Sequence, residues 1–536
     1  NQNFPRESRE VSMNPLITPQ QMRAMEQRYF TETGTPSIDL MEVAARSLNA
    51  AIARRYGPGK TVYFACGPGG NGGDGYACAR LYAKAGGKCA LFPAAPAKTP
   101  DAIANRERAL AMGIPELSCD ADVPAPDIWV DALYGTGLSR GPQGPAADLI
   151  RRMNADRLHG AKVVAVDIPS GLNGLTGAAF EPCVKADLTV TFQFEKTGHA
   201  LADGLDVCGA IEVADIGIPD AFHPGNMAAL VDRASVLSAL PPKPRNAHKG
   251  MNGHLLVVAG SVGMAGAAAL CAKAALRSGA GLVTVACPLS IVPVVQTLAP
   301  CAMALPLLEK EGALAPGAVD VLRCALAGKH AVACGCGLSR RAAPEVLKLL
   351  LECGLPALFD ADGLNLIAED PALKALLRPH HLVTPHPGEA ARLLGRRVAD
   401  PLADALALNG LGCQALLKGA TTVIPVNGTP WLSASGSAGM AKGGSGDVLT
   451  GLAGGLMAQY AAAPLAGVPL AICAAVASEL HGRAGELAAA KVGVRGMCAS
   501  DLVDALPEAL KEYAYSAREK PLDLACRPAS ALGEGA

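Results

Sequence analysis

The stretch CGPGGNGGDGY, residues 66 to 76, decides the fold of the first part of this chain. It follows the β-rich run TVYFAC, which starts at residue 61, and it opens a helix, so its glycines lie at a strand-to-helix turn. Further short β-rich runs follow, with helical stretches between the early ones: CALF at 89, IWVDA at 128, KVVAVDI at 162 and LTVTFQF at 188. This alternation predicts a doubly wound α/β sheet.

Two helices are expected before that sheet. Thr18 and Pro19 form a cap and first turn, and a second helix shows an apolar stripe at every fourth residue that ends before Gly57. The stripe consists of Leu40, Ala44, Leu48, Ile52 and Tyr56. The polar opening NQNFPRESREVS lacks the apolar core of a signal peptide and is left out of the fold prediction.

The second part of the chain repeats the alternation of strands and helices. Its β-rich runs are HLLVVAG at 254, GLVTVAC at 281, HAVACG at 330, PALFDAD at 356, HLVTPH at 381 and TTVIPV at 421. We expect these runs to form one sheet sandwiched by helices. The proline-rich seam LPPKPRNAHKG (240–250) separates the two parts, so the domain boundary is placed between about 225 and 245. The end, roughly 511–536, is predicted to be a flexible tail.

The composition narrows the class of function. The 47 Lys and Arg nearly cancel the 48 Asp and Glu, so there is no basic field for nucleic acid or anionic lipid, and a small molecule is the expected partner. The 17 scattered cysteines fit neither a disulfide framework nor a zinc site and are interpreted as reduced thiols in the cytoplasm. The charge-poor stretches 278–308 and 448–478 are broken by Pro and Gly and are interpreted as soluble core, not membrane spans.

The glycines of the first loop have the spacing found in the dinucleotide-binding loop of dehydrogenases. Gly67, Gly69 and Gly72 fit the dinucleotide fingerprint G-x-G-x-x-G. That fingerprint also requires an acid about 20 residues further on, at the end of the next strand, to hold the ribose. The run CALF ends instead at Pro93, followed by two alanines. The hypothesis that this domain transfers hydride therefore lacks the acidic residue that would bind the ribose.

Oxygen-bearing side chains gather where the strands of the first domain end. Asn71 and Asp74 lie in the glycine loop, and Asp131, Asp167 and Ser170 lie at or just past later strands. Such strand ends converge on one crevice in an open parallel sheet. Oxygen ligands without Cys or His suit a hard cation such as potassium or magnesium. The alternative is that each acid is an ordinary helix cap or loop residue.

The second domain carries a different anion cradle, AKGGSGDVLTG (441–451). Gly443, Gly444, Ser445 and Gly446 form a turn before a helix, and its N–H groups suit a phosphate. Asp447 would repel that phosphate unless its carboxylate faces a neighbouring hydroxyl, whose proton it could take during phosphoryl transfer. The alternative is that Asp447 only complements the helix dipole.

Seven motifs of the second part occur in one order and together resemble the ribokinase-like NAD(P)H-hydrate dehydratase family, over about 240 to 510. They are AHKGMNGHLLVVAGS (247–261), GAAAL (266–270), ALRSGAGLV (275–283), DADGLN (360–365), TPHPGE (384–389), LLKGATT (416–422) and GGSGDVLTG (443–451). The resemblance implies that ADP, or ATP in some branches, phosphorylates the hydroxyl of the hydrated nicotinamide ring. Elimination of phosphate then restores NAD(P)H.

The same resemblance assigns residues by matched position, with Asp447 as the catalytic base. The hydrate pocket would be lined by Ala267, Gly337, His386 and Asp447. The adenine nucleotide would be contacted by Lys418, Gly419, Ala420, Thr421, Thr422 and Gly446. Cys336 stands where the family usually has proline, which bears on the local turn. His386 by itself could be an ordinary hydrogen-bonded histidine, and its place in TPHPGE favours the pocket role.

Three motifs of the first part resemble the NAD(P)H-hydrate epimerase family over about 15 to 230. They are NGGDG (71–75), VDALYGTGL (130–138) and VDIPSGL (166–172). The resemblance implies interconversion of the two epimers of hydrated NAD(P)H, with Asp167 as acid–base group. Potassium would be bound by Asn71, Asp131 and Ser170. The hydrate would be held by Gly70, Asn71, Gly72, Gly73, Asp74, Gly135, Thr136, Gly137, Leu138, Ser139, Arg140, Gly141 and Asp167. Gly70 replaces the family's common asparagine, which leaves a backbone role there.

The two resemblances describe successive steps of one repair pathway, so the sequence predicts a bifunctional enzyme. We expect a Rossmann-like α/β/α epimerase domain at 13–230 and a ribokinase-like α/β/α dehydratase domain at 240–510. The implied cofactors are potassium in the epimerase domain, magnesium, and ADP or ATP as co-substrate. We expect a cytoplasmic homo-oligomer. The alternatives are a ribokinase-fold kinase of a vitamin or sugar hydroxyl, and a metabolite-binding or scaffold protein whose first domain is inactive.

Overall fold

A computed structural model describes residues 14–241, 243, 245–462 and 469–514 of the chain. These residues divide into two compact units. The N-terminal unit contains the described residues up to 231 together with 385–434, and the C-terminal unit contains those of 232–384 together with those from 435 onward.

The main sheet of the N-terminal unit has six parallel strands in the order β3-β2-β4-β5-β6-β8. The strands are β2 (Thr61–Cys66), β3 (Lys88–Pro93), β4 (Ile128–Ala132), β5 (Lys162–Val166), β6 (Leu188–Phe192) and β8 (Ala210–Ala214). The five β-rich runs predicted for this sheet are therefore confirmed. Because the strand order reverses between β2 and β4, the carboxyl ends of these two strands form the crevice where such sheets bind ligands.

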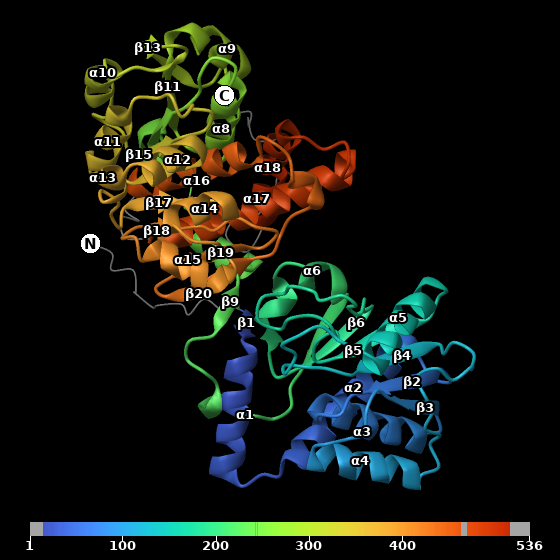
Figure 1. Ribbon diagram of the computed structural model, residues 1–536. Coiled ribbons are helices and arrows are strands. Elements are labelled where there is room, and N and C mark those ends of the chain that lie inside the picture. The colour runs from blue at the N-terminus through green and yellow to red at the C-terminus, as the bar shows by residue number, and fades with distance from the viewer. Residues whose placement is uncertain (1–13, 242, 244, 463–468, 515–536) are drawn as a thin grey trace, which may run out of the picture. The chain divides into compact units, whose positions relative to one another are not determined.

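Helices cover both faces of this sheet, as a doubly wound fold requires (Figure 1). On one face, α2 (Ser37–Tyr56) and α3 (Gly70–Lys84) pack on Phe64 and Val130. On the other, α5 (Pro145–Leu158) packs on Trp129 and Val163. Neighbouring residues of one strand thus enter opposite cores, in accord with the two-residue period of a strand. The predicted N-cap Thr18 of α1 (Pro19–Thr33) is also confirmed, since Thr18 and Gln21 form a capping box.

A second sheet of the N-terminal unit has the order β19-β20-β9-β1-β7. Its strands are β1 (Asn14–Ile17), β7 (Glu195–Lys196), β9 (Ala228–Leu230), β19 (Thr422–Val426) and β20 (Thr429–Ser433). The prediction that TTVIPV joins the sheet of the second part was wrong. Asn427 and Gly428 both have positive φ (50° and 82°) and close a tight antiparallel hairpin of β19 with β20. The hairpin then pairs with β9, far upstream in the chain.

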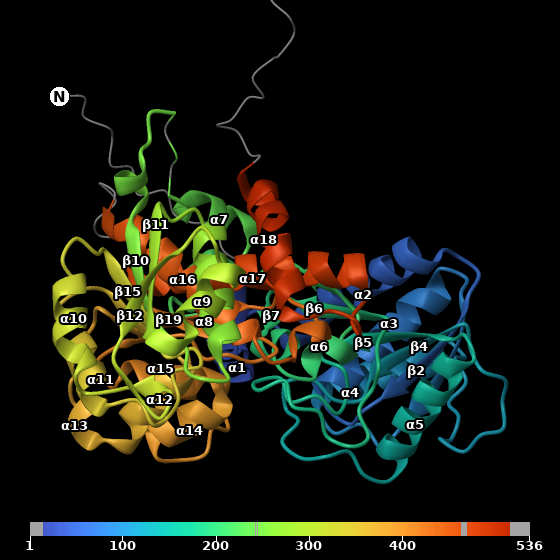
Figure 2. The same ribbon diagram turned by 90° about the horizontal axis from the view of Figure 1, so that it is seen from above.

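The C-terminal unit is also built on a parallel sheet, in which its strands follow the order β12-β11-β10-β15-β16-β17. The strands are β10 (His254–Val258), β11 (Leu282–Pro288), β12 (Met303–Leu307), β15 (Ala331–Cys334), β16 (Ala357–Phe359) and β17 (His381–Val383). The other five runs predicted for the second part are thus confirmed. Figures 1 and 2 show α8 (Ala265–Arg277) and α16 (Ser445–Ala462) on one side of these strands, with α10 (Ala318–Ala325) and α11 (Pro344–Glu352) on the other.

The remaining elements complete the two units. In the N-terminal unit they are α4 (Pro100–Ala111), η1 (Thr197–Ala200), α6 (Gly204–Val207), η2 (Asp220–Phe222), α14 (Pro387–Leu394), α15 (Pro401–Asn409) and β18 (Gln414–Ala415). In the C-terminal unit they are α7 (Arg233–Ala239), η3 (Lys249–Asn252), η4 (Leu289–Ile291), α9 (Val292–Leu298), β13 (Glu309–Lys310), β14 (Ala313–Leu314), α12 (Ala361–Glu369), α13 (Pro371–Lys374), η5 (Ala438–Met440), α17 (Leu470–Val492) and α18 (Ala499–Ala514).

Three predictions concern the ends of the chain and the charge-poor stretches. Helix α18 continues to Ala514, so the first residues of the predicted tail are helical, and the rest of the tail and the opening segment lie outside the described residues. The stretch 278–308 folds as β11, η4, α9 and β12. Among the helices of the described residues, none has the length and apolar character that crossing a membrane requires.

Candidate active sites in the two units

A cavity of about 510 Å³ opens in the N-terminal unit at the carboxyl ends of β2 and β4. Its walls come from α1, α2, the start of α3, the loop after β4 and the residue that follows β5. The cavity therefore lies at the switch point where the sheet predicts ligand binding. Its polar lining consists of Glu26, Ser37, Asn71, Asp74, Asp101, Tyr134, Thr136 and Asp167.

Two glycines of the first loop are required by close backbone packing. A Cβ added at Gly67 would lie 1.8 Å from the carbonyl oxygen of Leu133, and one at Gly72 would lie 1.9 Å from that of Gly67. Gly70 differs, because a Cβ there would meet no atom within 4 Å. Helix α3 begins at Gly70, so the unpaired N–H groups of its first turn lie at the cavity and suit an anionic group.

The structure brings most of the predicted hydrate-binding residues of this unit together. The residues that line the cavity are Gly70, Asn71, Asp74, Gly135, Thr136, Gly137, Leu138 and Asp167. The predicted residues that are not among its lining are Gly72, Gly73, Ser139, Arg140 and Gly141. Arg23 of α1 donates from NH1 to the carbonyl oxygen of Thr136 at 2.8 Å, which fixes one wall of the cavity.

Asp167 carries a buried ion pair at the edge of the cavity. It adopts a positive φ of 64° immediately after β5, and its Oδ1 lies 2.5 Å from Nζ of Lys196. The Lys196 side chain is fully buried, and Nζ also donates to Thr191 Oγ1 and to the carbonyl oxygens of Phe192 and Phe194, at 2.9, 2.9 and 3.1 Å. The ammonium group of Lys196 is thus paired and hydrogen-bonded by protein atoms, and it holds the Asp167 carboxylate in place.

Two charged residues of this site, Lys196 and Glu26, were not predicted from the sequence. Lys196 follows an apolar strand, and nothing local indicated that β7 would pair with β1 and bury the side chain. Glu26 lies in a helix of polar composition that resembled a surface helix. Burial is the main cause that raises the pKa of Glu26 to about 7, and the charge of Asp167 adds to it. Burial together with the charges of Asp167 and Glu26 also raises the pKa of Asp74 well above its usual value.

His199 lies next to this ion pair. Its Nδ1 accepts a hydrogen bond from the backbone N–H of Lys196 at 3.3 Å, and its buried Nε2 has no hydrogen-bond partner among the described residues. Burial first, and then the charge of Lys196, lower the pKa of His199 to about 4. His199 is therefore neutral at physiological pH.

The predicted cation ligands lie at the same edge of the sheet. Asp131 is fully buried and accepts from Ser170 N and Ser170 Oγ at 2.7 and 2.6 Å, and from Leu133 N at 3.2 Å. Burial raises the pKa of Asp131 to about 6, although these hydrogen bonds oppose the rise. The amide nitrogen of Asn71 is buried and has no hydrogen-bond partner among the described residues. The carboxylate of Asp131 and the hydroxyl of Ser170 supply oxygen atoms of the kind that a hard cation prefers as ligands.

In the C-terminal unit, the predicted anion cradle leads directly into α16. Gly444 has a positive φ of 96°, which glycine adopts without strain. Ser445 is fixed on both sides, since its Oγ donates to Met440 O at 2.7 Å and its carbonyl accepts from Nε2 of His481 at 2.9 Å. A Cβ at Gly451 would lie 2.0 Å from Cys271 O, so this glycine allows α16 to pack closely on α8. The turn is therefore held rigidly by its surroundings.

The predicted hydrate-pocket residues of this unit come from three neighbouring elements. Gly337, after β15, has a positive φ of 58°, and a Cβ there would lie 3.0 Å from the Cβ of Ala267 on α8. A hydrogen bond with Cys271 and burial raise the pKa of the neighbouring Cys336 thiol, and the charge of Asp447 contributes to the rise. Gly337 and Ala267 are thus neighbours, and Asp447 lies near enough to Cys336 for its charge to affect the pKa of that thiol.

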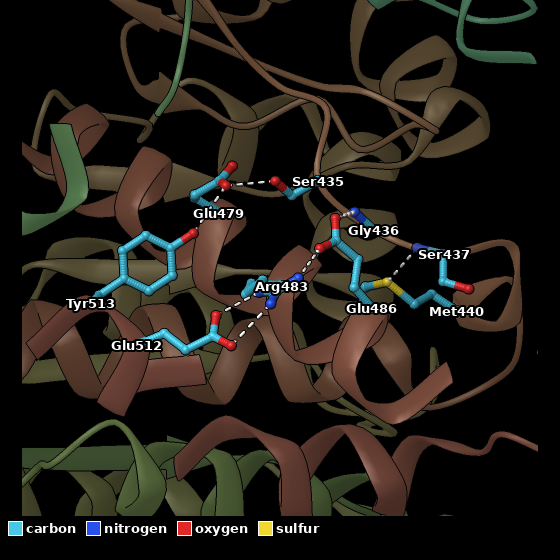
Figure 3. A network of polar contacts seen from close by, with 9 residues as sticks. All are labelled: Ser435, Gly436, Ser437, Met440, Glu479, Arg483, Glu486, Glu512 and Tyr513. Carbon is cyan, nitrogen blue, oxygen red and sulfur yellow. Dashed lines mark hydrogen bonds and ion pairs between the residues drawn. The ribbon is translucent and has the colours of Figure 1, made fainter. Parts of the chain in front are cut away.

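Helix α17 secures the segment that precedes the glycine turn (Figure 3). Glu479 accepts from Ser435 Oγ at 2.5 Å, and Glu486 accepts from Gly436 N at 3.1 Å. Arg483 forms an ion pair with Glu486 at 2.6 Å. These contacts hold the segment between β20 and η5 against α17.

His386 and the predicted nucleotide-binding segment fall in the N-terminal unit. His386 is the N-cap of α14, since its Nδ1 accepts from Gly388 N at 3.0 Å, while its own N–H donates to Glu389 at 2.9 Å. Lys418 lies in the turn before β19, with Nζ 3.9 Å from the same Glu389. In that turn, Thr421 Oγ1 donates to the carbonyl oxygen of Ala200. The structure therefore gives His386 a capping role, and its predicted role in the hydrate pocket stays a prediction.

Comparison with known proteins shows which family the chain belongs to. Residues 37–198 match the family model described as YjeF-related protein N-terminus, and residues 255–508 match the one described as NAD(P)H-hydrate dehydratase. The bifunctional NAD(P)H-hydrate repair enzyme Nnr of Moorella thermoacetica is 37% identical over 92% of this chain and 96% of that protein. The chain belongs to the family of bifunctional NAD(P)H-hydrate repair enzymes.

A second relative gives the same result. The Nnr enzyme of Coxiella burnetii is 35% identical over 91% of this chain and 98% of that protein. Among solved structures, an ADP/ATP-dependent NAD(P)H-hydrate dehydratase from Bacillus subtilis is 26% identical, with a TM-score of 0.43, over 53% of this chain and 99% of that one.

Proposed function

We propose that this chain repairs hydrated NAD(P)H in two steps. A domain at 13–230 interconverts the R and S epimers of the hydrate, and a domain at 240–510 converts the S epimer to NAD(P)H with ADP or ATP as co-substrate. The observation that carries the proposal is the likeness to the Moorella repair enzyme over 96% of that protein's length. The two family matches, at 37–198 and 255–508, fall within the two proposed domains.

For the epimerase step, we assign acid–base chemistry to Asp167. The hydrate carries its hydroxyl on a carbon next to the ring nitrogen, so protonation of that hydroxyl allows the C–O bond to break with help from the nitrogen lone pair. The ion pair with Lys196 fixes the Asp167 carboxylate at the cavity edge. The segments 70–74 and 135–141 would hold the hydrate, and the free N–H groups at the start of α3 suit its phosphates.

Potassium is the proposed cation of this domain, held by Asn71, Asp131 and Ser170. The side-chain oxygen atoms of these residues, which lie at one edge of the sheet, support this assignment. When bound, the cation would supply positive charge beside the anionic substrate. Magnesium is proposed for the dehydratase step, where it would bind mainly through the nucleotide phosphates, a mode that needs few protein ligands.

For the dehydratase step, we assign the role of base to Asp447. Its carboxylate would take the proton of the ring hydroxyl as the oxygen attacks the terminal phosphoryl group of the nucleotide. The N–H groups of the 443–446 turn would stabilise the charge that develops on the phosphoryl oxygens. We propose Ala267, Gly337 and His386 as further hydrate contacts. The proposed nucleotide contacts are Lys418, Gly419, Ala420, Thr421, Thr422 and Gly446.

The products distinguish this proposal from a ribokinase-fold kinase. Purified chain is mixed with the S epimer of NADH hydrate, magnesium and ADP or ATP. The proposal expects one free phosphate and one NADH, seen by its near-ultraviolet absorbance, for each nucleotide consumed. A phosphorylated organic product that persists, without recovery of absorbance, would show a kinase instead. We also propose a cytoplasmic homo-oligomer, and light scattering of the purified chain tests the oligomeric state.

A further inference from the structure

We infer that Glu26 is a second catalytic acid–base residue of the epimerisation and acts together with Asp167. The inference rests on the proposed epimerase function. Glu26 lies on α1, not on one of the strand-end loops that carry the other assigned groups. It therefore approaches the cavity from a different element of the fold.

The position of Glu26 on α1 directs it to the cavity. Met22 and Phe30, one helical turn before and after it, line the same cavity, so this face of α1 forms a wall. Glu26 is partly buried there, and it makes no hydrogen bond or ion pair with any residue that the structure describes. A partly buried carboxylate with no protein partner remains available to a bound substrate.

The two acids differ in their surroundings. Asp167 accepts from Lys196 and from Thr191 Oγ1, at 2.5 and 3.0 Å, so its contacts suit an ionised acceptor. Glu26 lines the same cavity as Asp167, whose negative charge disfavours a further ionised carboxylate. Burial first, and then the charge of Asp167, raise the pKa of Glu26 to about 7, although Lys196 and Arg23 oppose the rise. Both forms of Glu26 are therefore populated near neutral pH, as an acid–base catalyst requires.

The proposed step conserves atoms and charge. Protonated Glu26 donates its proton to the ring hydroxyl, the C–O bond breaks, the nitrogen lone pair forms a C=N bond, and water departs. A water molecule then adds to the opposite face of the ring carbon while Asp167 accepts its proton. One C–O bond is broken and one is formed, and solvent carries the proton from Asp167 back to Glu26. The reverse reaction exchanges the two roles.

The Glu26→Gln variant tests the inference, with Glu32→Gln on the same helix as the matched control. Glu32 is exposed, and within the described part of the chain its ion pair is a surface one, with Arg28. Full-length wild type and variants receive the purified R epimer without nucleotide, and chromatography follows the appearance of the S epimer above the buffer rate. Loss of an acid–base group is expected to slow interconversion by about 100-fold or more in Glu26→Gln, and Glu32→Gln should match wild type.

Three further readouts separate a catalytic role of Glu26 from an effect on folding. Dehydration of the S epimer should proceed at the wild-type rate in Glu26→Gln. The pH dependence of epimerisation should show an ionisation near pH 7 in wild type that the variant lacks. In H₂¹⁸O, wild type should incorporate one ¹⁸O for each inversion. Any one of three results would overturn the inference. They are inversion without ¹⁸O incorporation, a pH profile of Glu26→Gln that equals that of wild type, and a Glu26→Gln epimerisation rate within about threefold of wild type.

If the proposed epimerase function itself is wrong, the experiment gives a different result. If wild type itself does not interconvert the epimers above the buffer rate, then the proposed epimerase function is wrong. If wild type is active and Glu26→Gln equals it, then only the role of Glu26 is wrong.

Discussion

Replacing Lys196 by Met removes the ammonium group of the buried ion pair but keeps a long apolar side chain. The variant leaves the buried Asp167 carboxylate with Thr191 Oγ1, at 3.0 Å, as its closest donor. It also removes the Nζ–H donors from the carbonyls of Phe192 and Phe194. Breaking a buried pair in this way costs about 3–5 kcal/mol of unfolding free energy, because one charge remains buried without its partner.

The effect on thermal stability can be followed in the affected unit alone. For a unit of this size, each kcal/mol shifts Tm by about 2–4 °C, so we expect a decrease of about 6–20 °C. The chain has 2 tryptophans, Trp129 in β4 and Trp431 in β20, and both belong to the N-terminal unit. Tryptophan fluorescence during heating therefore reports on the unfolding of this unit.

The double variant Lys196→Met with Asp167→Asn provides the control. It removes the uncompensated charge, so we expect it to regain much of the lost Tm but not the epimerase activity. A single variant with unchanged Tm, or a double variant no more stable than the single one, would refute the account of the ion pair.

Three further predictions concern other parts of the sites. Asp447→Asn should lower dehydration at least about 100-fold while nucleotide binding, measured by calorimetry, stays near wild type. Gly72→Ala should destabilise the N-terminal unit by about 1–3 kcal/mol in urea unfolding, because its Cβ would overlap a backbone oxygen, whereas Gly70→Ala should not. The pKa of His199 in the folded protein is about 4, below its usual value, so the wild-type free energy of unfolding should fall by about 2 kcal/mol between pH 7 and pH 5. The His199→Gln variant should not show this decrease.

The sequence predicted the strands and the first glycine loop because their signals are local. Runs such as TVYFAC and HLLVVAG are apolar and β-branched, and they became β2 and β10. Gly67 and Gly72 were recognised as loop glycines, and the structure shows which backbone atoms their missing side chains would meet.

The pairing of strands that lie far apart in the sequence could not be predicted in the same way. The run at 421 was correctly identified as a strand, and its hairpin with β20 is local, but β20 then pairs with β9, about 200 positions upstream. The pairing of β1 with β7 is equally distant, and this contact helps to bury Lys196 beside Asp167. The polar composition of α1 concealed Glu26, because a single acidic residue facing a cavity leaves no periodic signal.

The most direct test of the central claim uses a racemic mixture of NADH hydrate. Purified full-length chain is incubated with the mixture, magnesium, potassium and an excess of ADP or ATP, and NADH absorbance is followed until it stops rising. A chain with both activities should recover all of the NADH at a rate well above spontaneous epimerisation. A rapid plateau near half recovery would contradict the epimerase assignment, and no recovery at all would contradict the dehydratase assignment.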